Sequence, residues 1–135
     1  MSIARKRYYC PVEVAVDVLG KRWTPVILAH LKEGVHRYGE LRRRMPEVSE
    51  KVLTQRLRGL ERDGLVERSV HPGVPAPVSY RLTEEGRGLA PVLQALYDWG
   101  RERADRHGVA IEPVEPLESV EPVAAETVAA ETDVT

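Results

Sequence analysis

The sequence predicts one mainly α-helical domain that carries a small β-hairpin. Glycines and prolines divide the first 108 residues into helix-length segments. Leu53, Leu57 and Leu60 recur at the spacing of one helical face. Residues 65–70 and 78–82 have the length and apolar content of strands, and a segment rich in proline joins them. A chain of 135 residues is long enough to bury one compact core.

Two helices are expected near the N-terminus. The first begins at Pro11, because proline is favoured at the first helical position, and Gly20 ends it. Its apolar residues fall on nearly all sides, so this helix needs cover from two directions. The second ends at Gly34 and carries apolar residues at helical spacing: Trp23, Ile27, Leu28 and Leu31.

A closely spaced pair of helices follows. Residues 35–38 fit a short strand, and residues 39–45 fit a short helix that Pro46 ends. Ser49 is a favoured N-cap for a longer helix that runs to Asp63 and is terminated by Gly64. Two helices joined by a turn this tight are typical of motifs that present the second helix to a DNA major groove.

A hairpin and a long final helix complete the domain. Residues 71–77 join the two strands, and their prolines and glycine suit a hairpin tip. Thr83 is a natural cap for the last helix, which is expected to run without interruption to about His107. This order of elements is that of a winged helix-turn-helix with further helices at both ends, which we expect to serve in dimerisation.

Charge is distributed unevenly along the chain. The chain has 20 basic and 21 acidic residues, but residues 109–135 contain seven acidic residues and no lysine or arginine. Residues 1–108 therefore carry a formal charge of +6, which is typical of nucleic-acid-binding domains and also occurs in many other soluble domains. We expect the domain to span residues 1–108 and residues 109–135 to form a disordered acidic tail, which either solubilises the chain or screens it from non-specific DNA.

The helix expected at residues 49–63 has a polar face opposite its leucines. Glutamine pairs with adenine and arginine with guanine through two hydrogen bonds each, and serine, threonine and lysine hold phosphates. An ordinary solvent-exposed face has the same periodicity, but the arginines before this helix and the hairpin after it add positive surface in the right order. The residues predicted to contact DNA are Arg42, Arg43, Arg44, Ser49, Lys51, Thr54, Gln55, Arg58, Arg62, Arg68, His71 and Arg81.

The first and last helices leave more apolar surface than one small core can use. Part of this surface closes the core of the monomer, and pairing across a twofold axis buries the rest. Such a dimer sets two recognition helices about 34 Å apart and predicts a pseudo-palindromic operator in double-stranded DNA. The residues predicted at the dimer interface are Val12, Val16, Leu19, Leu89, Val92, Leu93, Leu96 and Trp99.

Other functional classes find little support. No apolar run approaches the length of a membrane span and no signal peptide is recognisable, so a cytoplasmic protein without a membrane partner is expected. The single cysteine, Cys10, allows neither an internal disulfide nor a multi-cysteine zinc site. We find no phosphate-binding loop, no Gly-x-Ser-x-Gly motif and no metal spacing among the four histidines, and expect no enzyme activity, metal or cofactor.

Several stretches of the chain match one known family. They are Cys10-Pro11-Val12-Glu13, Leu19-Gly20-Lys21-Arg22-Trp23, Arg37-Tyr38-Gly39-Glu40-Leu41, Leu53-Thr54-Gln55-Arg56-Leu57-Arg58-Gly59-Leu60-Glu61 and Val78-Ser79-Tyr80-Arg81-Leu82-Thr83. Together they resemble the HxlR-type winged-helix regulators of the MarR-like superfamily over roughly residues 8–107. This resemblance implies a dimeric bacterial DNA-binding regulator, a repressor or an activator, that often responds to stress or to small molecules.

Cys10 is the one candidate for a redox switch. It lies at the N-terminus of the first helix, behind Arg5, Lys6 and Arg7, and both the helix dipole and these cations favour a thiolate. The resemblance implies a sensor of oxidants or electrophiles, since some HxlR-type proteins use such a cysteine. An inert thiol fits the sequence equally well, because reactivity depends on exposure.

The main alternative to DNA binding is an interaction module. A winged helix can contact a partner protein through the same surface, since a fold does not fix a function.

Overall fold

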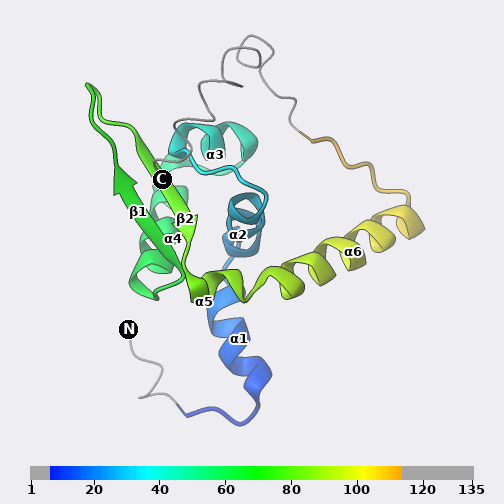
Figure 1. The fold of residues 1–135 in the computed structure, drawn as a ribbon. Coiled ribbons are helices and arrows are strands. Elements are labelled where there is room, and N and C mark those ends of the chain that lie inside the picture. The colour runs from blue at the N-terminus through cyan, green and yellow to red at the C-terminus, as the bar shows by residue number, and fades with distance from the viewer. Residues whose placement is uncertain (1–6, 114–135) are drawn as a thin grey trace.

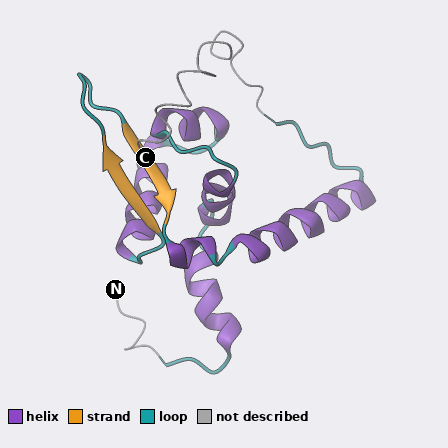
Figure 2. Ribbon diagram, in the orientation of Figure 1, coloured by secondary structure: helices purple, strands orange, loops and turns teal. Residues whose placement is uncertain are grey.

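The computed structural model describes residues 7–113 (Figure 1). Their fold is mainly helical with a two-stranded antiparallel hairpin, as the sequence predicts (Figure 2). The elements in chain order are α1 Pro11–Leu19, α2 Thr24–Lys32, α3 Tyr38–Arg44, α4 Glu50–Arg62, β1 Val66–Val70, β2 Val78–Leu82, α5 Glu84–Arg87 and α6 Ala90–His107.

The core lies where α2, α3 and α4 meet the hairpin. Five side chains in it are fully buried: Ile27, Leu28, Leu41, Leu53 and Leu57. Burying each of them contributes about 1.5–3 kcal/mol relative to leaving it in water. Tyr80 and Leu82 of β2 and Leu93 of α6 extend this cluster, so the hairpin and the start of α6 are anchored to the three helices.

The strand predicted at residues 35–38 is wrong, because the structure forms only an isolated β-bridge there. Arg37 pairs with Ser79, and the Tyr80 amide donates a hydrogen bond to the His36 carbonyl at 2.9 Å. The chain turns into α3 at Tyr38, so the pairing cannot extend further. The bridge nevertheless ties the start of α3 to β2.

The hairpin is regular, and its register decides which side chains share a face. Pairing runs from Val66 opposite Leu82 to Val70 opposite Val78. Because side chains alternate between the two faces of a strand, Arg68 lies on one face and Arg81 on the other. The His71 amide donates a hydrogen bond to the Pro77 carbonyl at 2.8 Å, which closes the hairpin tip.

The last helix is broken, which corrects the expectation of one helix from Thr83 to His107. Thr83 does cap a helix, since its Oγ1 accepts the Gly86 amide at 3.1 Å, but that helix is only α5. Pro91 has no amide hydrogen, and its ring would clash with the carbonyl four residues earlier in a continuous helix. Helix α5 therefore ends at Arg87, and a new helix, α6, begins at Ala90 with Pro91 in its first turn.

Helices α1 and α6 project away from the body of the domain (Figure 1). No residue of α1 is buried, and in α6 only Leu93 and Ala104 are. Within residues 7–113, no helix combines the length and apolar character that a membrane span requires. Residues 109–113 are exposed coil, and the predicted disorder of the acidic tail concerns mostly residues 114–135, which lie outside the described range.

Candidate nucleic-acid interface

Helix α4 starts where the sequence predicts and ends one residue earlier than predicted, at Arg62. The Ser49 Oγ accepts the Val52 amide at 3.1 Å, an N-cap that stabilises the helix by about 1 kcal/mol. Glu50 lies in the first turn, where the helix dipole favours a negative charge. The helix ends at Arg62, and Gly64 follows with a φ of 78°, a left-handed conformation that suits glycine.

The two faces of α4 have opposite environments. Its leucines, Leu53, Leu57 and Leu60, are at most 3% exposed and belong to the core. The residues that form what we call the polar face are all exposed to solvent: Lys51, Gln55, Arg58 and Arg62. None of the three cations on it is ion-paired within the described residues. The monomer thus leaves the whole polar face accessible to a partner.

A groove of about 360 Å³ runs between α4 and the hairpin. Arg58 of α4 and Arg68 of β1 line it from opposite sides, and two carboxylates, Glu50 and Glu61, lie in it as well. At its floor, the Thr54 hydroxyl lies 3.4 Å from the Tyr38 hydroxyl. Thr54 is therefore half-buried and engaged with α3, unlike the residues of the polar face. The other lining residues are Val78 and Tyr80.

The arginines of α3 are partly neutralised. Glu40 pairs with Arg43 at 2.7 Å and with Arg44 at 2.9 Å, along the i,i+3 and i,i+4 spacings of the helix. The Arg43 hydrogen bond, together with Arg44, holds the pKa of Glu40 below its usual value. Burial, with Arg44 nearby, lowers the pKa of His30. Of the three arginines of α3, only Arg42 is exposed and without an ion pair in the described range.

Of the three hairpin residues predicted to contact DNA, one lies in the groove between α4 and the hairpin. Arg68 is exposed and lines the groove. Arg81 lies on the other face and pairs with Glu67 at 3.2 Å. The His71 ring is half-buried, and its Nε2 lies 2.8 Å from the Ser79 hydroxyl. Arg81 and His71 therefore have partners within the hairpin and do not line the groove beside α4.

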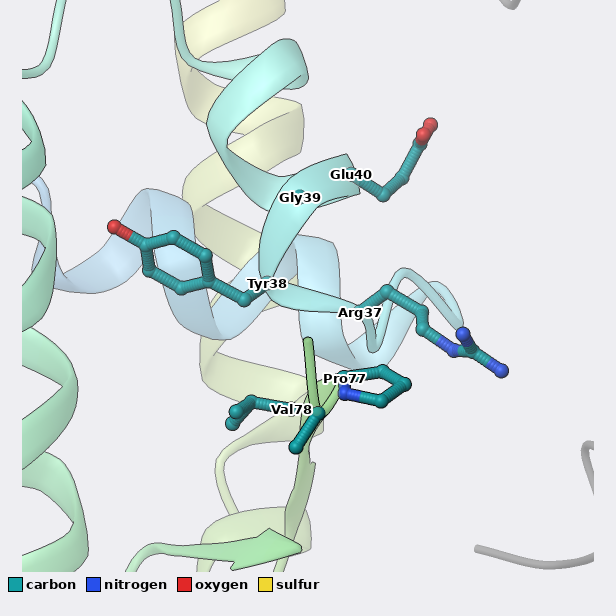
Figure 3. Close-up of a pocket in the computed structure, with 7 residues that line it drawn as sticks. Arg37, Tyr38, Gly39, Glu40, Pro77 and Val78 are labelled. Atoms are coloured by element: carbon teal, nitrogen blue, oxygen red, sulfur yellow. The ribbon is translucent and has the colours of Figure 1, made fainter. Parts of the chain in front are cut away.

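A second hollow, of about 510 Å³, lies between the start of α3 and the start of β2, beside the hairpin tip. Figure 3 shows the Tyr38 ring extending to the side opposite the Arg37 and Glu40 side chains, above Pro77 and Val78. None of its lining residues was among the predicted DNA contacts.

Arg56 is a residue of α4 to which the sequence assigned no role. Its Nε donates a hydrogen bond to the Arg22 carbonyl at 2.9 Å, in the segment between α1 and α2. The two residues are 34 positions apart, and helical periodicity carries no signal for such a contact.

The apolar residues of α1 and α6 divide into an exposed and a packed group. Val12, Val16, Val92, Leu96 and Trp99 are between 42% and 64% exposed. Leu19 of α1 and Leu89, at the N-cap position of α6, are half-buried and pack against the core. Leu93 is 3% exposed and belongs to the core of the monomer, so its prediction as a dimer-interface residue is wrong.

Cys10 is exposed and occupies the N-cap position of α1. Its carbonyl accepts the Glu13 amide at 2.9 Å, and the Tyr9 amide donates to a Glu13 carboxylate oxygen at 3.1 Å. Arg5 and Lys6, the cations expected behind it, lie outside the described residues. Among residues 7–113, no group of three or more potential ligands is placed to hold a metal ion.

Comparison with known proteins identifies close relatives. The sequence model of the HxlR-like helix-turn-helix family matches residues 18–108. The chain is 46% identical over 94 residues to an HTH-type transcriptional regulator of Methanothermobacter thermautotrophicus, covering 70% of this chain and 72% of the relative. It is 44% identical over 97 residues to the HTH-type transcriptional regulator YdeP of Bacillus subtilis, covering 72% and 76%.

Several solved structures are similar to this chain in both sequence and fold. The redox regulator HypR in its reduced form is 39% identical, with a TM-score of 0.68 over 75% of this chain and 100% of that one. The reduced transcriptional regulator YodB of B. subtilis is 40% identical, with a TM-score of 0.59 over 73% and 94%. With the family match over most of the domain, these relatives show that the chain belongs to the HxlR-like helix-turn-helix family of DNA-binding transcriptional regulators.

Proposed function

We propose that this regulator binds a pseudo-palindromic operator as a homodimer, with α4 in the major groove and the hairpin alongside as a wing. The observation that carries the proposal is the accessibility of the polar face. Its four residues point to solvent while the leucines on the opposite side of α4 anchor the helix in the core. A helix that packs in the core through its leucines and leaves a free face of amide and guanidinium groups suits base recognition.

The side chains on and around α4 suit different contacts. Gln55 and Arg58 lie at the middle of the polar face and suit base edges, glutamine reading adenine and arginine reading guanine. Lys51 and Arg62, toward the ends of the helix, suit phosphates on either side. Ser49, Arg42 and Arg68 extend the same surface onto the neighbouring elements. Thr54, Arg43, Arg44, Arg81 and His71, which have partners within the chain, suit secondary roles at its edge.

Dimerisation through α1 and α6 accounts for their exposed apolar side chains. Val12 and Val16 line one side of α1, and Val92, Leu96 and Trp99 lie on α6, and the monomer leaves each of them about half exposed. Their contact with a second copy removes this surface from water, and hydrophobic burial contributes about 25 cal/mol per Å². Dimeric regulators of this kind read two half-sites about one helical turn apart.

The second part of the proposal is that a thiol modification or a small molecule controls DNA binding. Cys10 is exposed at the start of α1, next to the apolar surface proposed for dimerisation. The related HypR and YodB structures include oxidised and diamide-treated forms, and HypR is named a redox regulator. Modification of Cys10 therefore has a direct route to the arrangement of the two subunits.

Selection of bound DNA from a random duplex pool tests the proposal. We expect an enriched pair of inverted half-sites. Gln55→Ala and Arg58→Ala should each lose about 1–3 kcal/mol of discrimination at one base position per half-site. Gln94→Ala is the matched control, because this glutamine is exposed on α6 and bonds Asp98 at 3.1 Å.

The outcomes separate the proposal from its alternatives. A selected sequence whose recognition is unchanged by both α4 substitutions contradicts α4 as the recognition helix. Absence of any enrichment, together with binding that does not weaken as salt rises, favours a protein-interaction module. Repeating the selection with reduced protein, oxidised protein and a Cys10→Ser variant tests the thiol switch, which fails if oxidation changes wild type and variant alike.

A further inference from the structure

The junction between α1 and α2, residues 20–23, is held in an unusual conformation. Trp23 has a φ of 79°, in the left-handed region that non-glycine residues adopt at a cost. The Arg22 guanidinium stacks over the Trp23 ring at 4.6 Å, and the ring itself packs against the core. Left-handed backbone at a tryptophan persists only where its surroundings hold it in place.

The junction is tied to the recognition helix through Arg56. The Nε of Arg56 donates a hydrogen bond to the Arg22 carbonyl at 2.9 Å. Arg22 is the residue immediately before the left-handed Trp23. In the helical register, Arg56 lies on one flank of α4, between the buried leucines and the polar face. Glu50, Thr54 and Glu61 lie on the other flank and line the groove that faces the hairpin.

Helix α4 is therefore held from two sides. The hairpin borders it on one flank, and the α1–α2 junction holds the other through Arg56. Because α1 leads directly into this junction and has no buried residue of its own, a shift of α1 moves the point to which Arg56 is attached. A turn of α4 about its axis then changes where the polar face points.

We propose that Arg56 is a positioning residue, which fixes the orientation of α4 relative to α1 and thereby sets the operator half-site spacing that the dimer accepts. The inference rests on the proposed function, since it requires a dimer joined through α1 and a recognition helix α4. It assigns Arg56 a task distinct from DNA contact: its guanidinium is engaged with the protein backbone, while Gln55 and Arg58 beside it face solvent.

Spacing-variant operators provide the test. The selected operator is compared with versions that have one base pair added or removed between the half-sites, which shifts one half-site by about 3.4 Å and rotates it by about 35°. We expect wild type to lose at least about tenfold in affinity on either variant, and Arg56→Met to reduce that loss to less than about threefold. Arg56→Lys, which keeps the charge and a donor, should lie in between.

Arg87→Met is the matched control. Arg87 also donates to a main-chain carbonyl, that of Leu82 at 3.1 Å, but this bond joins α5 to the end of β2 and involves neither α4 nor the α1–α2 junction. We expect this variant to discriminate between spacings as wild type does. Thermal melting by circular dichroism should show both methionine variants folded, with midpoints within about 5 °C of wild type.

Three results would overturn the inference. Unchanged spacing discrimination in Arg56→Met refutes the positioning role. If Arg56→Met loses affinity equally for operator and random DNA, and its slope of log K against log salt is smaller by about 1.8 per dimer, Arg56 is a phosphate contact instead. If wild type itself binds DNA without preferring any spacing, the proposed function fails and the positioning role fails with it. The wild-type measurement thus separates the two failures.

Discussion

Arg68 and Arg81 provide a direct test of which hairpin face meets DNA. The two arginines lie on adjacent strands, but the pairing register places them on opposite faces. Arg68 lines the groove beside Arg58 of α4, whereas Arg81 is paired with Glu67 at 3.2 Å. Both side chains are exposed, so replacing either with alanine removes one positive charge per subunit without opening a cavity.

The expected magnitude follows from counterion release. Each phosphate contact contributes about 0.9 to the slope of log K against log salt, so Arg68→Ala should reduce the slope by about 1.8 per dimer. If the electrostatic contribution vanishes near 1 M salt, this corresponds to a loss in affinity of about 30-fold at 0.15 M and about 200-fold at 0.05 M. Arg81→Ala changes the net charge equally and should leave the slope within about 0.5 of wild type.

Fluorescence anisotropy with a labelled operator between 50 and 300 mM KCl measures these slopes. Random duplex of the same length should show the same reduction for Arg68→Ala, because phosphate contacts carry no sequence information. Equal slopes for wild type and Arg68→Ala would refute the assignment of the α4-side face as the DNA-facing side. A larger reduction for Arg81→Ala than for Arg68→Ala would reverse the assignment.

Three further predictions concern the elements that position the interface. Ser49→Ala removes the acceptor of the Val52 amide and should cost about 1 kcal/mol in urea denaturation, whereas Ser49→Asp should retain stability. Gly86→Ala would place a Cβ 2.2 Å from the Leu65 carbonyl oxygen, a main-chain atom, and should lower the melting temperature by at least about 5 °C. Glu40 has a lowered pKa, so its contribution to stability is complete above about pH 4.5 and is lost as the pH falls through its folded value; Glu40→Gln should flatten acid denaturation over that range. An acid profile identical to that of wild type would contradict this last expectation.

Signals between neighbouring residues in the sequence predicted helix α4 well. A serine cap, three leucines at helical spacing and a terminating glycine are properties of neighbouring residues, and the structure places all of them as expected. The exposed polar face follows from the same periodicity, since residues opposite a buried stripe on a surface helix point to solvent. The Glu40 pairs were also readable, because they follow the i,i+3 and i,i+4 rule within one helix.

Contacts between elements were harder to predict. Arg81 and Arg68 are equivalent in the sequence, and only the pairing register of the hairpin separates them. Leu93 fits the apolar stripe of the last helix, yet its burial depends on the angle at which α6 leaves the body after the break at Pro91. The bond between Arg56 and Arg22 joins residues 34 apart, and the acceptor immediately precedes Trp23, whose left-handed backbone no propensity favours.

Carboxylates among the cations of the proposed interface shift its balance from affinity toward specificity. Glu50 and Glu61 line the groove with Arg58 and Arg68, and Glu40 partly neutralises two arginines of α3. A negative charge near the DNA backbone weakens binding to every sequence alike, because all duplexes carry the same phosphates. The base contacts that we propose for Gln55 and Arg58 distinguish sequences, so their share of the total free energy of binding rises as the shared electrostatic part falls. For a regulator that must find an operator among a great excess of other sites, less attraction to phosphate is an advantage.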